Sequence, residues 1–207
     1  MTSMPLWSSI IKKYKYAIVL FWLILWQIAA IAIDNNIVLV GPVDTAEALL
    51  VLVRQPSFWL SVLNTFLRIA AGFFAALISG VILGFAGYKY RLFYEFLDPL
   101  ISLMKAIPVA SFVILAIIWL GGSERLGSFV AFVVVFPMVY LSTVSGLMST
   151  DKKLLEMAEV FKIRAIKKII YLYLPALFPY LINCCKTSLS MSWKSGVAAE
   201  LIGQPVN

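Results

Sequence analysis

The stretch EMAEVFKIRAIKKIIYLYLP, residues 156–175, decides the fold class of this chain. It mixes acidic and basic side chains, lies between two long apolar runs and ends in Leu174-Pro175. From Leu154 to Lys168 the residues are mostly good helix formers, with no Gly or Pro. Apolar side chains recur at spacings of three and four in and just before it: Leu154, Leu155, Ala158 and Phe161. The pattern predicts a short amphipathic helix outside the membrane, which could lie on the membrane surface or fit a groove on a soluble partner.

Composition places the rest of the chain in the membrane. Hydrophobic residues make up 62% of the 207 residues and charged residues 13%. Soluble domains have roughly half and a quarter, so the chain is an integral membrane protein. The net charge of +7 is spread over short clusters between apolar runs, so no nucleic-acid partner is expected. The absence of His removes the usual proton relay and the commonest metal ligand, and neither catalytic residues nor a metal are expected.

Five apolar runs are long enough to cross a bilayer, which needs roughly 20 residues per helix. They cover about residues 16–33, 62–87, 97–120, 126–148 and 169–189. The third contains Pro99 and Pro108, so it is expected to be kinked or preceded by a surface helix. We expect residues 1–60 to form an N-terminal segment with the first span and an external loop. Residues 61–207 would then form the membrane core, with the charged loop at 150–175.

Lys and Arg in the short loops predict the orientation, because cytoplasmic loops carry an excess of them. One side receives eleven: Lys12, Lys13, Lys15, Lys89, Arg91, Lys152, Lys153, Lys162, Arg164, Lys167 and Lys168. The other side receives two, Arg54 and Arg125. The N-terminus and the loop around Glu156 are therefore expected on the cytoplasmic side of a plasma membrane.

The charged stretch resembles the cytoplasmic coupling loop of binding-protein-dependent ABC importer permeases. That loop has Glu-Ala-Ala, a later Gly and a final Ile-x-Leu-Pro at fixed spacing. The pattern falls here on Glu156, Met157, Ala158, Lys162, Leu172, Leu174 and Pro175. Lys162 stands where the family has Gly, which is the one serious departure. Looser segments in the family's order resemble its nitrate, sulfonate and taurine group: residues 64–69, 71–73, 98–99, 106–108, 117–121 and 193–203.

The resemblance implies an all-α polytopic bundle of the type I importer permease kind. About five spans would be present, and the family's final helix is expected to be missing. It also implies the partners: a separate ABC ATPase subunit, a second permease copy in a homodimer, an extracytoplasmic solute-binding protein and the lipid membrane. The chain has no Gly-x-x-x-x-Gly-Lys-Ser/Thr phosphate loop. ATP is therefore expected in the partner subunit, and this chain is expected to be a transport subunit without a cofactor or enzymatic activity.

By the same resemblance the loop docks onto the ATPase subunit. The residues expected to take part are Leu155, Glu156, Met157, Ala158, Phe161, Lys162, Leu174 and Pro175. Small Ala158 would let the partner approach closely, and Glu156 offers a carboxylate. At Lys162 the helix is expected either to continue or to turn with modest strain, since Lys in a left-handed conformation costs about 1 kcal/mol.

Ionisable residues near the spans are the candidates for a solute pathway. They are Arg68, Lys194 beside Trp193, and Glu200. Lys194 and Glu200 are six residues apart and do not face each other on one straight helix, so each needs a partner from elsewhere. Arg68 could instead extend outward to the membrane surface, and Lys194 could lie in water if the fifth span ends near Ser190. Gly80 and Gly84 predict close helix packing.

The leading hypothesis is thus a permease subunit of an ATP-driven importer. The resemblance implies nitrate, an alkanesulfonate, taurine or a vitamin-precursor heterocycle as the solute, and the basic groups of Arg68 and Lys194 favour an anion among these. An ion-coupled secondary transporter is the alternative, although it would need membrane-embedded carboxylates or broken-helix ion sites in two related halves, and no internal repeat is apparent. An intramembrane enzyme would need nucleophile-base or metal motifs that the chain does not contain.

Overall fold

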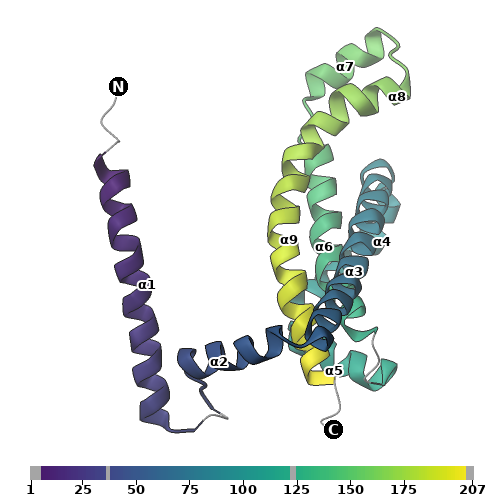
Figure 1. The fold of residues 1–207 in the computed structure, drawn as a ribbon. Coiled ribbons are helices and arrows are strands. Elements are labelled where there is room, and N and C mark those ends of the chain that lie inside the picture. Colours follow the sequence, from purple (N-terminus) through teal and green to yellow (C-terminus); the bar gives the residue numbers. More distant parts are fainter. Residues whose placement is uncertain (1–5, 36–37, 122–124, 204–207) are drawn as a thin grey trace. The chain divides into compact units, whose positions relative to one another are not determined.

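The computed structural model describes residues 6–35, 38–121 and 125–203, with side chains from Tyr14 onward. In these ranges every regular element is a helix (Figure 1). In chain order they are α1 (Leu6–Ile33), α2 (Pro42–Val53), α3 (Pro56–Lys89), α4 (Arg91–Ala106), α5 (Val109–Leu120), α6 (Leu126–Met148), α7 (Lys152–Val160), α8 (Ala165–Lys168), the π-helical turn η1 (Ile169–Tyr173) and α9 (Leu174–Gly203). The chain divides into two compact units, Met1–Val62 and Leu63–Asn207, which we describe separately.

The first unit holds α1, α2 and the beginning of α3. Residues Tyr14–Ile33 of α1 are apolar enough to cross a membrane. Gln27, the one strongly polar side chain predicted for this span, accepts a hydrogen bond from the Val43 backbone N–H at 3.3 Å. Helix α2 begins at Pro42, where a missing N–H costs nothing, and it buries none of its residues. Its 12 residues are too few to cross a membrane, in agreement with the external loop predicted within residues 1–60.

The second unit is built around α6, which is buried along most of its length. One core cluster joins Phe73 of α3, Ile101 of α4, Phe136 and Tyr140 of α6, and Cys184 of α9. The chain therefore has the expected all-α membrane architecture, with its core inside a helical bundle.

Glycines set the distance between α3 and α6. A Cβ atom on Gly80 would lie 2.8 Å from Cγ1 of Val139, and one on Gly84 would lie 2.6 Å from Cβ of Thr143. Real Cβ atoms do not approach that closely, so both positions need the absence of a side chain. The structure thus brings the predicted small-residue pair directly against a neighbouring helix.

Among the described residues, four helical segments are long and apolar enough to span a membrane, and a bent pair makes up to five. The bent pair is α4 and α5, which meet at an angle of 101° where the sequence predicts its third span. The break falls at Ile107-Pro108, with Ile107 in an extended conformation at ψ 127°. A residue before Pro avoids helical geometry, and Pro lacks an N–H, so Pro108 is the cause. Pro99 stays inside α4.

The last helix is longer than the sequence predicts. Residues Ala165–Gly203 form one helical run of 39 residues, so Leu174-Pro175 lies inside a helix and does not end a loop. The π turn explains how the run accommodates Pro175. The Leu174 N–H bonds to the Ile169 carbonyl five residues back, which widens the helix just before a residue that has no N–H.

Candidate functional site

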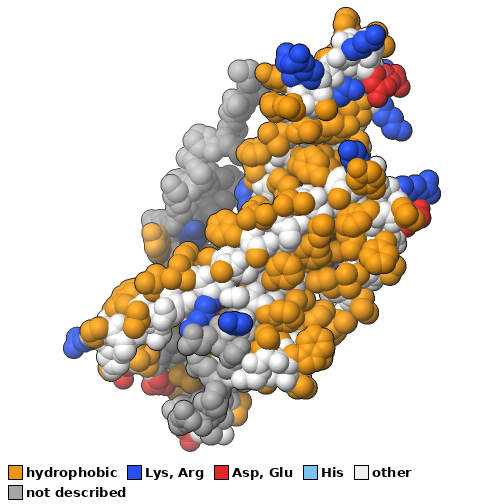
Figure 2. All heavy atoms as spheres, turned by 90° about the vertical axis from the view of Figure 1, so that its right-hand side faces the viewer, with side chains coloured by type: hydrophobic (Ala, Val, Ile, Leu, Met, Phe, Trp, Pro, Cys, Tyr) orange, Lys and Arg blue, Asp and Glu red, His pale blue; other side chains and the backbone are white. Residues whose placement is uncertain are grey.

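Helix α7 is a separate helix with defined ends. Asp151 caps its beginning, because the Lys153 backbone N–H donates to Asp151 Oδ1 at 2.9 Å. In Figure 1 α7 and α8 lie together at one end of the second unit, beyond the ends of α6 and α3. Figure 2 shows Lys and Arg side chains gathered at that same end, above a broad hydrophobic surface. Basic side chains at the end of an apolar helical bundle are typical of a loop that lies outside the membrane.

Lys162 ends the helix in a left-handed turn, with φ of 48°. The Lys162 N–H donates to the Glu159 carbonyl and the Ile163 N–H to the Ala158 carbonyl, each at 2.9 Å. These two bonds define a Schellman turn, in which Gly normally occupies the left-handed position. Of the two outcomes expected for Lys162, the helix therefore turns and does not continue.

The apolar stripe of α7 is divided between two faces. Ala158 is only 1% exposed, and Leu155 is half-buried. Leu154, Met157 and Phe161 are 42%, 46% and 72% exposed, at the spacing of one helix face. Ala158, which is expected to let a partner approach closely, is instead packed within the loop itself. The face open to a partner is carried by Leu154, Met157 and Phe161.

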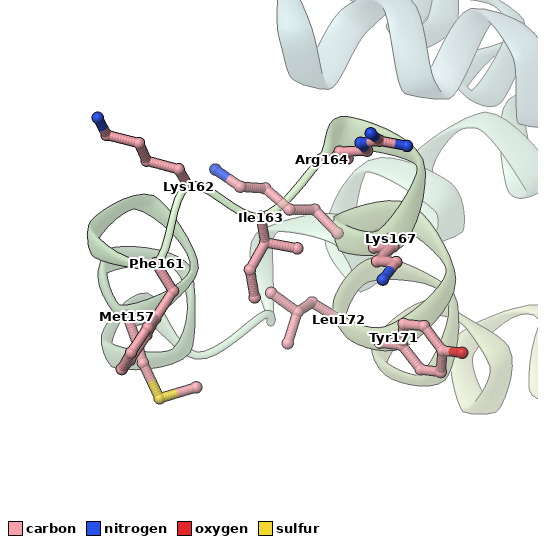
Figure 3. A pocket seen from close by; sticks show the side chains of 9 residues that line it. Met157, Phe161, Lys162, Ile163, Arg164, Lys167, Tyr171 and Leu172 are labelled. Carbon is pink, nitrogen blue, oxygen red and sulfur yellow. The ribbon is translucent and has the colours of Figure 1, made fainter.

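A hollow of about 770 Å³ lies between α7 and the α8–η1 segment. Figure 3 shows Met157 and Phe161 on one wall and Tyr171 on the other. Ile163 and Leu172 lie between the walls, and Lys162 points away. Of the other residues predicted to dock, Glu156, Leu174 and Pro175 are exposed.

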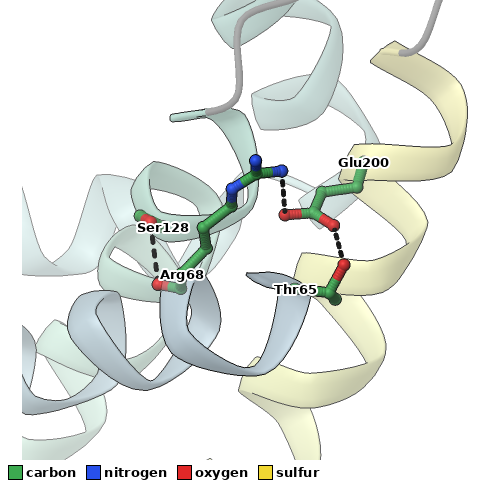
Figure 4. Close-up of polar contacts among 4 residues, drawn as sticks. All are labelled: Thr65, Arg68, Ser128 and Glu200. Carbon is green, nitrogen blue, oxygen red and sulfur yellow. Dashed lines mark hydrogen bonds and ion pairs between the residues drawn. The ribbon is translucent and has the colours of Figure 1, made fainter. Parts of the chain in front are cut away.

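At the other end of the bundle, Figure 4 shows the Glu200 carboxylate beside Arg68 and Thr65, with Ser128 next to the Arg68 backbone. Glu200 Oε1 lies 3.7 Å from an Arg68 guanidinium nitrogen, and Thr65 donates to Glu200 Oε2 at 2.6 Å. The Ser128 hydroxyl donates to the Arg68 carbonyl at 2.7 Å. The partners of Glu200 are thus on α3. This agrees with the expectation that Glu200 cannot pair with Lys194 on the same helix. We call these four residues the Arg68–Glu200 cluster; it ties α3, α6 and α9 together.

The cluster is held by charge more than by a direct bond between Arg68 and Glu200. Their side chains are 26% and 10% exposed, and 3.7 Å is too long for a hydrogen bond. Glu200 Oε1 has no hydrogen-bond partner although it is buried. A Cβ on Gly127 would come within 2.7 Å of that oxygen, so a glycine makes room for the carboxylate. Thr65, Gly127 and Ser128 were not predicted, since small residues carry no signal of their own in the sequence.

Lys194 and Trp193 lie in a different place, a groove of about 570 Å³ between α3 and α9. The Trp193 and Phe66 rings are 6.0 Å apart in it. Lys186 lines the same groove, and no acidic residue does. Lys186 and Lys194 are eight residues apart, a spacing that puts both on one helix face. The predicted pathway residues therefore separate into a paired cluster, Arg68 with Glu200, and a basic groove.

Comparison with known proteins identifies the chain's class. Residues 72–207 match the binding-protein-dependent transport system inner membrane components, and the chain belongs to that family. It is a permease component of an ABC importer, a multi-pass plasma-membrane protein and a transport subunit.

Its relatives come from several kinds of importer. The chain is 25% identical to the nitrate import permease protein NrtB of Synechocystis sp., over 87% of this chain and 68% of that protein. It is 25% identical to the taurine transport system permease protein TauC of Escherichia coli, over 86% and 66%. It is 29% identical to the putative aliphatic sulfonates transport permease protein SsuC of Bacillus subtilis, over 86% and 65%. The chain spans about two thirds of the length of these relatives.

Proposed function

We propose that this chain, as one of two copies, forms the solute path of an ATP-driven importer of small anions, and that a separate ATPase subunit binds α7. The observation that carries the coupling role is the exposed apolar face of Leu154, Met157 and Phe161 on a capped helix outside the bundle. A short helix with a few apolar anchors is a common way to fit a groove on a partner. The excess of basic residues on that side supports a cytoplasmic position for α7 and for the N-terminus.

The basic groove supports the anionic solute. Lys186 and Lys194 line it with no acidic residue, and Arg68 and Glu200 offset each other's charge. The groove therefore keeps a net positive charge beside aromatic and hydroxyl side chains. A solute such as nitrate or a sulfonate carries the complementary charge, and the names of the three relatives point to the same chemistry. A neutral heterocycle would gain nothing from the two ammonium groups. Solute delivery by an extracytoplasmic binding protein is part of this proposal.

Site-specific cross-linking tests the coupling role. Met157→Cys lies on the exposed face of α7, and Leu155→Cys two residues earlier is half-buried. In membranes containing the ATPase subunit, a short bifunctional cross-linker should join the ATPase to Met157→Cys and leave Leu155→Cys unlinked. A membrane-impermeant maleimide should label Met157→Cys only after the cells are opened.

Two results would contradict the proposal. If Met157→Cys reacts from outside intact cells, the orientation is wrong. If the ATPase is never captured, and uptake in vesicles follows a proton or sodium gradient without ATP hydrolysis, the chain would be an ion-coupled transporter. In that case the carboxylate of Glu200 would be the first group to examine.

A further inference from the structure

A second pocket, of about 430 Å³, lies where the membrane helices end on the α7 side of the bundle. Its walls come from the last turn of α3, the end of α6, and the α8–η1 segment. Phe85, Leu147 and Ile169 make it apolar inside. It shares only Lys168 with the hollow beside α7, so it is a separate site.

The lining of this pocket is also basic and aromatic. Lys89 and Lys168 line it together with Tyr88 and Tyr173, whose rings are 5.6 Å apart in an edge-to-face arrangement. No acidic residue lines the pocket. Within the described part of the chain, neither lysine makes an ion pair; the ion pairs join Arg68 to Glu200 and Arg91 to Glu95. The Lys89 ammonium lies 5.2 Å from the Tyr90 ring centroid, a contact that leaves its N–H donors available.

The level of the pocket matches the headgroup region of a bilayer. Helix α3 ends at Lys89 and α6 at Met148, and both are membrane-spanning candidates. Lys and Tyr at the ends of such helices are typical of the membrane-water interface. Lys89 and Lys168 at this level can therefore bind an anionic group of the membrane surface.

We propose that this pocket binds the headgroup of an anionic phospholipid. The phosphate lies between the ammonium groups of Lys89 and Lys168, and an acyl chain lies against the accessible side chains of Phe85 and Ile169. Basic pockets between membrane helices on the cytoplasmic side suit such headgroups. A free phosphate ion would use the two lysines but not the apolar wall, which is why the lipid fits better.

The site has a consequence for the loop. Lys168 is the last residue of α8 and Lys89 the last of α3, so a bound phosphate joins the loop to the bundle by its charge. The proposal does not depend on what α7 binds, and lipid binding can be measured with this chain alone.

The experiment counts lipids bound to the purified full chain in detergent by native mass spectrometry, during titration with phosphatidylglycerol or phosphatidylcholine. The wild-type chain should bind phosphatidylglycerol in preference. Lys89→Gln and Lys168→Gln should each weaken that preference about fivefold and the double variant about thirtyfold, the strength usual for lysines at an anionic membrane surface. Lys153→Gln removes an exposed charge from the same loop outside the pocket and should change nothing.

Each other outcome rejects the proposal. Equal binding by the double variant would show that the pocket is not the site, and an equal loss in Lys153→Gln would show general attraction to a basic surface. If inorganic phosphate at millimolar concentration displaces the lipid, the site is one for a free anion. If Ala165→Cys, at the pocket edge, is protected from a maleimide by the ATPase subunit and not by phosphatidylglycerol, the occupant is a protein.

Discussion

Replacing Lys162 by Gly should stabilise the end of α7. Lys162 holds a φ of 48°, a conformation that costs an L-residue with a side chain about 1–2 kcal/mol. Gly removes that cost, but it gains more freedom in the opened chain, which offsets about 0.5–1 kcal/mol. The net gain is about 0.5–1 kcal/mol. It acts on one local structure, the Schellman turn closed by the N–H groups of Lys162 and Ile163.

Hydrogen exchange at those two amides measures the effect directly. A gain of about 0.5–1 kcal/mol corresponds to exchange roughly two to five times slower in Lys162→Gly. Two variants isolate the cause. Lys162→Ala loses the charge but keeps the strained backbone, so its exchange should match the wild type. Lys153→Gly makes the same chemical change inside the helix, where Gly costs about 0.5–1 kcal/mol, and should accelerate exchange.

The reasoning would be refuted if Lys162→Gly exchanged faster than the wild type. It would also be refuted if Lys162→Ala slowed exchange as much as Gly does, because charge and not backbone strain would then control the turn. The substitution should leave uptake unchanged, since Lys162 helps to line the hollow beside α7 but its side chain extends away from it. Loss of uptake in a folded Lys162→Gly protein would show that the lysine itself contacts a partner.

Two further predictions concern the other end of the bundle. Arg68→Met leaves the buried carboxylate of Glu200 without its cation and should lower the free energy of unfolding in detergent by about 3 kcal/mol, measured by thermal unfolding. The double variant with Glu200→Met should recover most of this loss. Additive effects of the two substitutions would mean that the two side chains do not interact. Lys194→Gln and Lys186→Gln should each raise the KM for uptake of an anionic solute by about fivefold, because each ammonium in the groove attracts bound solute and transition state alike. The control Lys153→Gln should leave the KM unchanged. An unchanged KM in the two groove variants would show that the solute path does not pass through this groove.

The sequence predicted most of the helices because hydrophobic periodicity and loop charge are local signals. Residues 126–148 were predicted as a span and form α6 with the same ends. The two prolines of the third run were harder to separate, because both Pro99 and Pro108 can break a helix. Only the geometry shows that Pro99 is tolerated and that Pro108 turns the chain by 101°.

The candidate docking residues could be predicted from the sequence where they recur at a regular spacing along one helix. The position of the α7 loop follows from such a pattern. Which face of α7 points outward does not follow from the pattern. Leu154 and Ala158 lie on neighbouring rows of one helix, and only the folded loop shows that Ala158 is buried and Leu154 exposed. The pairing of Arg68 with Glu200 joins residues far apart in the chain, and no local pattern marks it.

The two ends of the bundle are joined by one helix, which links the proposed coupling loop to the Arg68–Glu200 cluster. The run Ala165–Gly203 has 39 residues and would be about 58 Å long as a regular helix. The Thr65 hydroxyl lies 2.6 Å from Glu200, so a shift of about 1 Å along that line breaks the bond. A subunit that moves α7 would pull on this helix, and small displacements at its far end are enough to release the cluster. The Arg68→Met, Glu200→Met protein tests the link, since it keeps α7 intact but loses the cluster: ATP hydrolysis by the associated ATPase should continue while uptake per ATP falls. Unchanged uptake per ATP would show that the cluster only stabilises the fold.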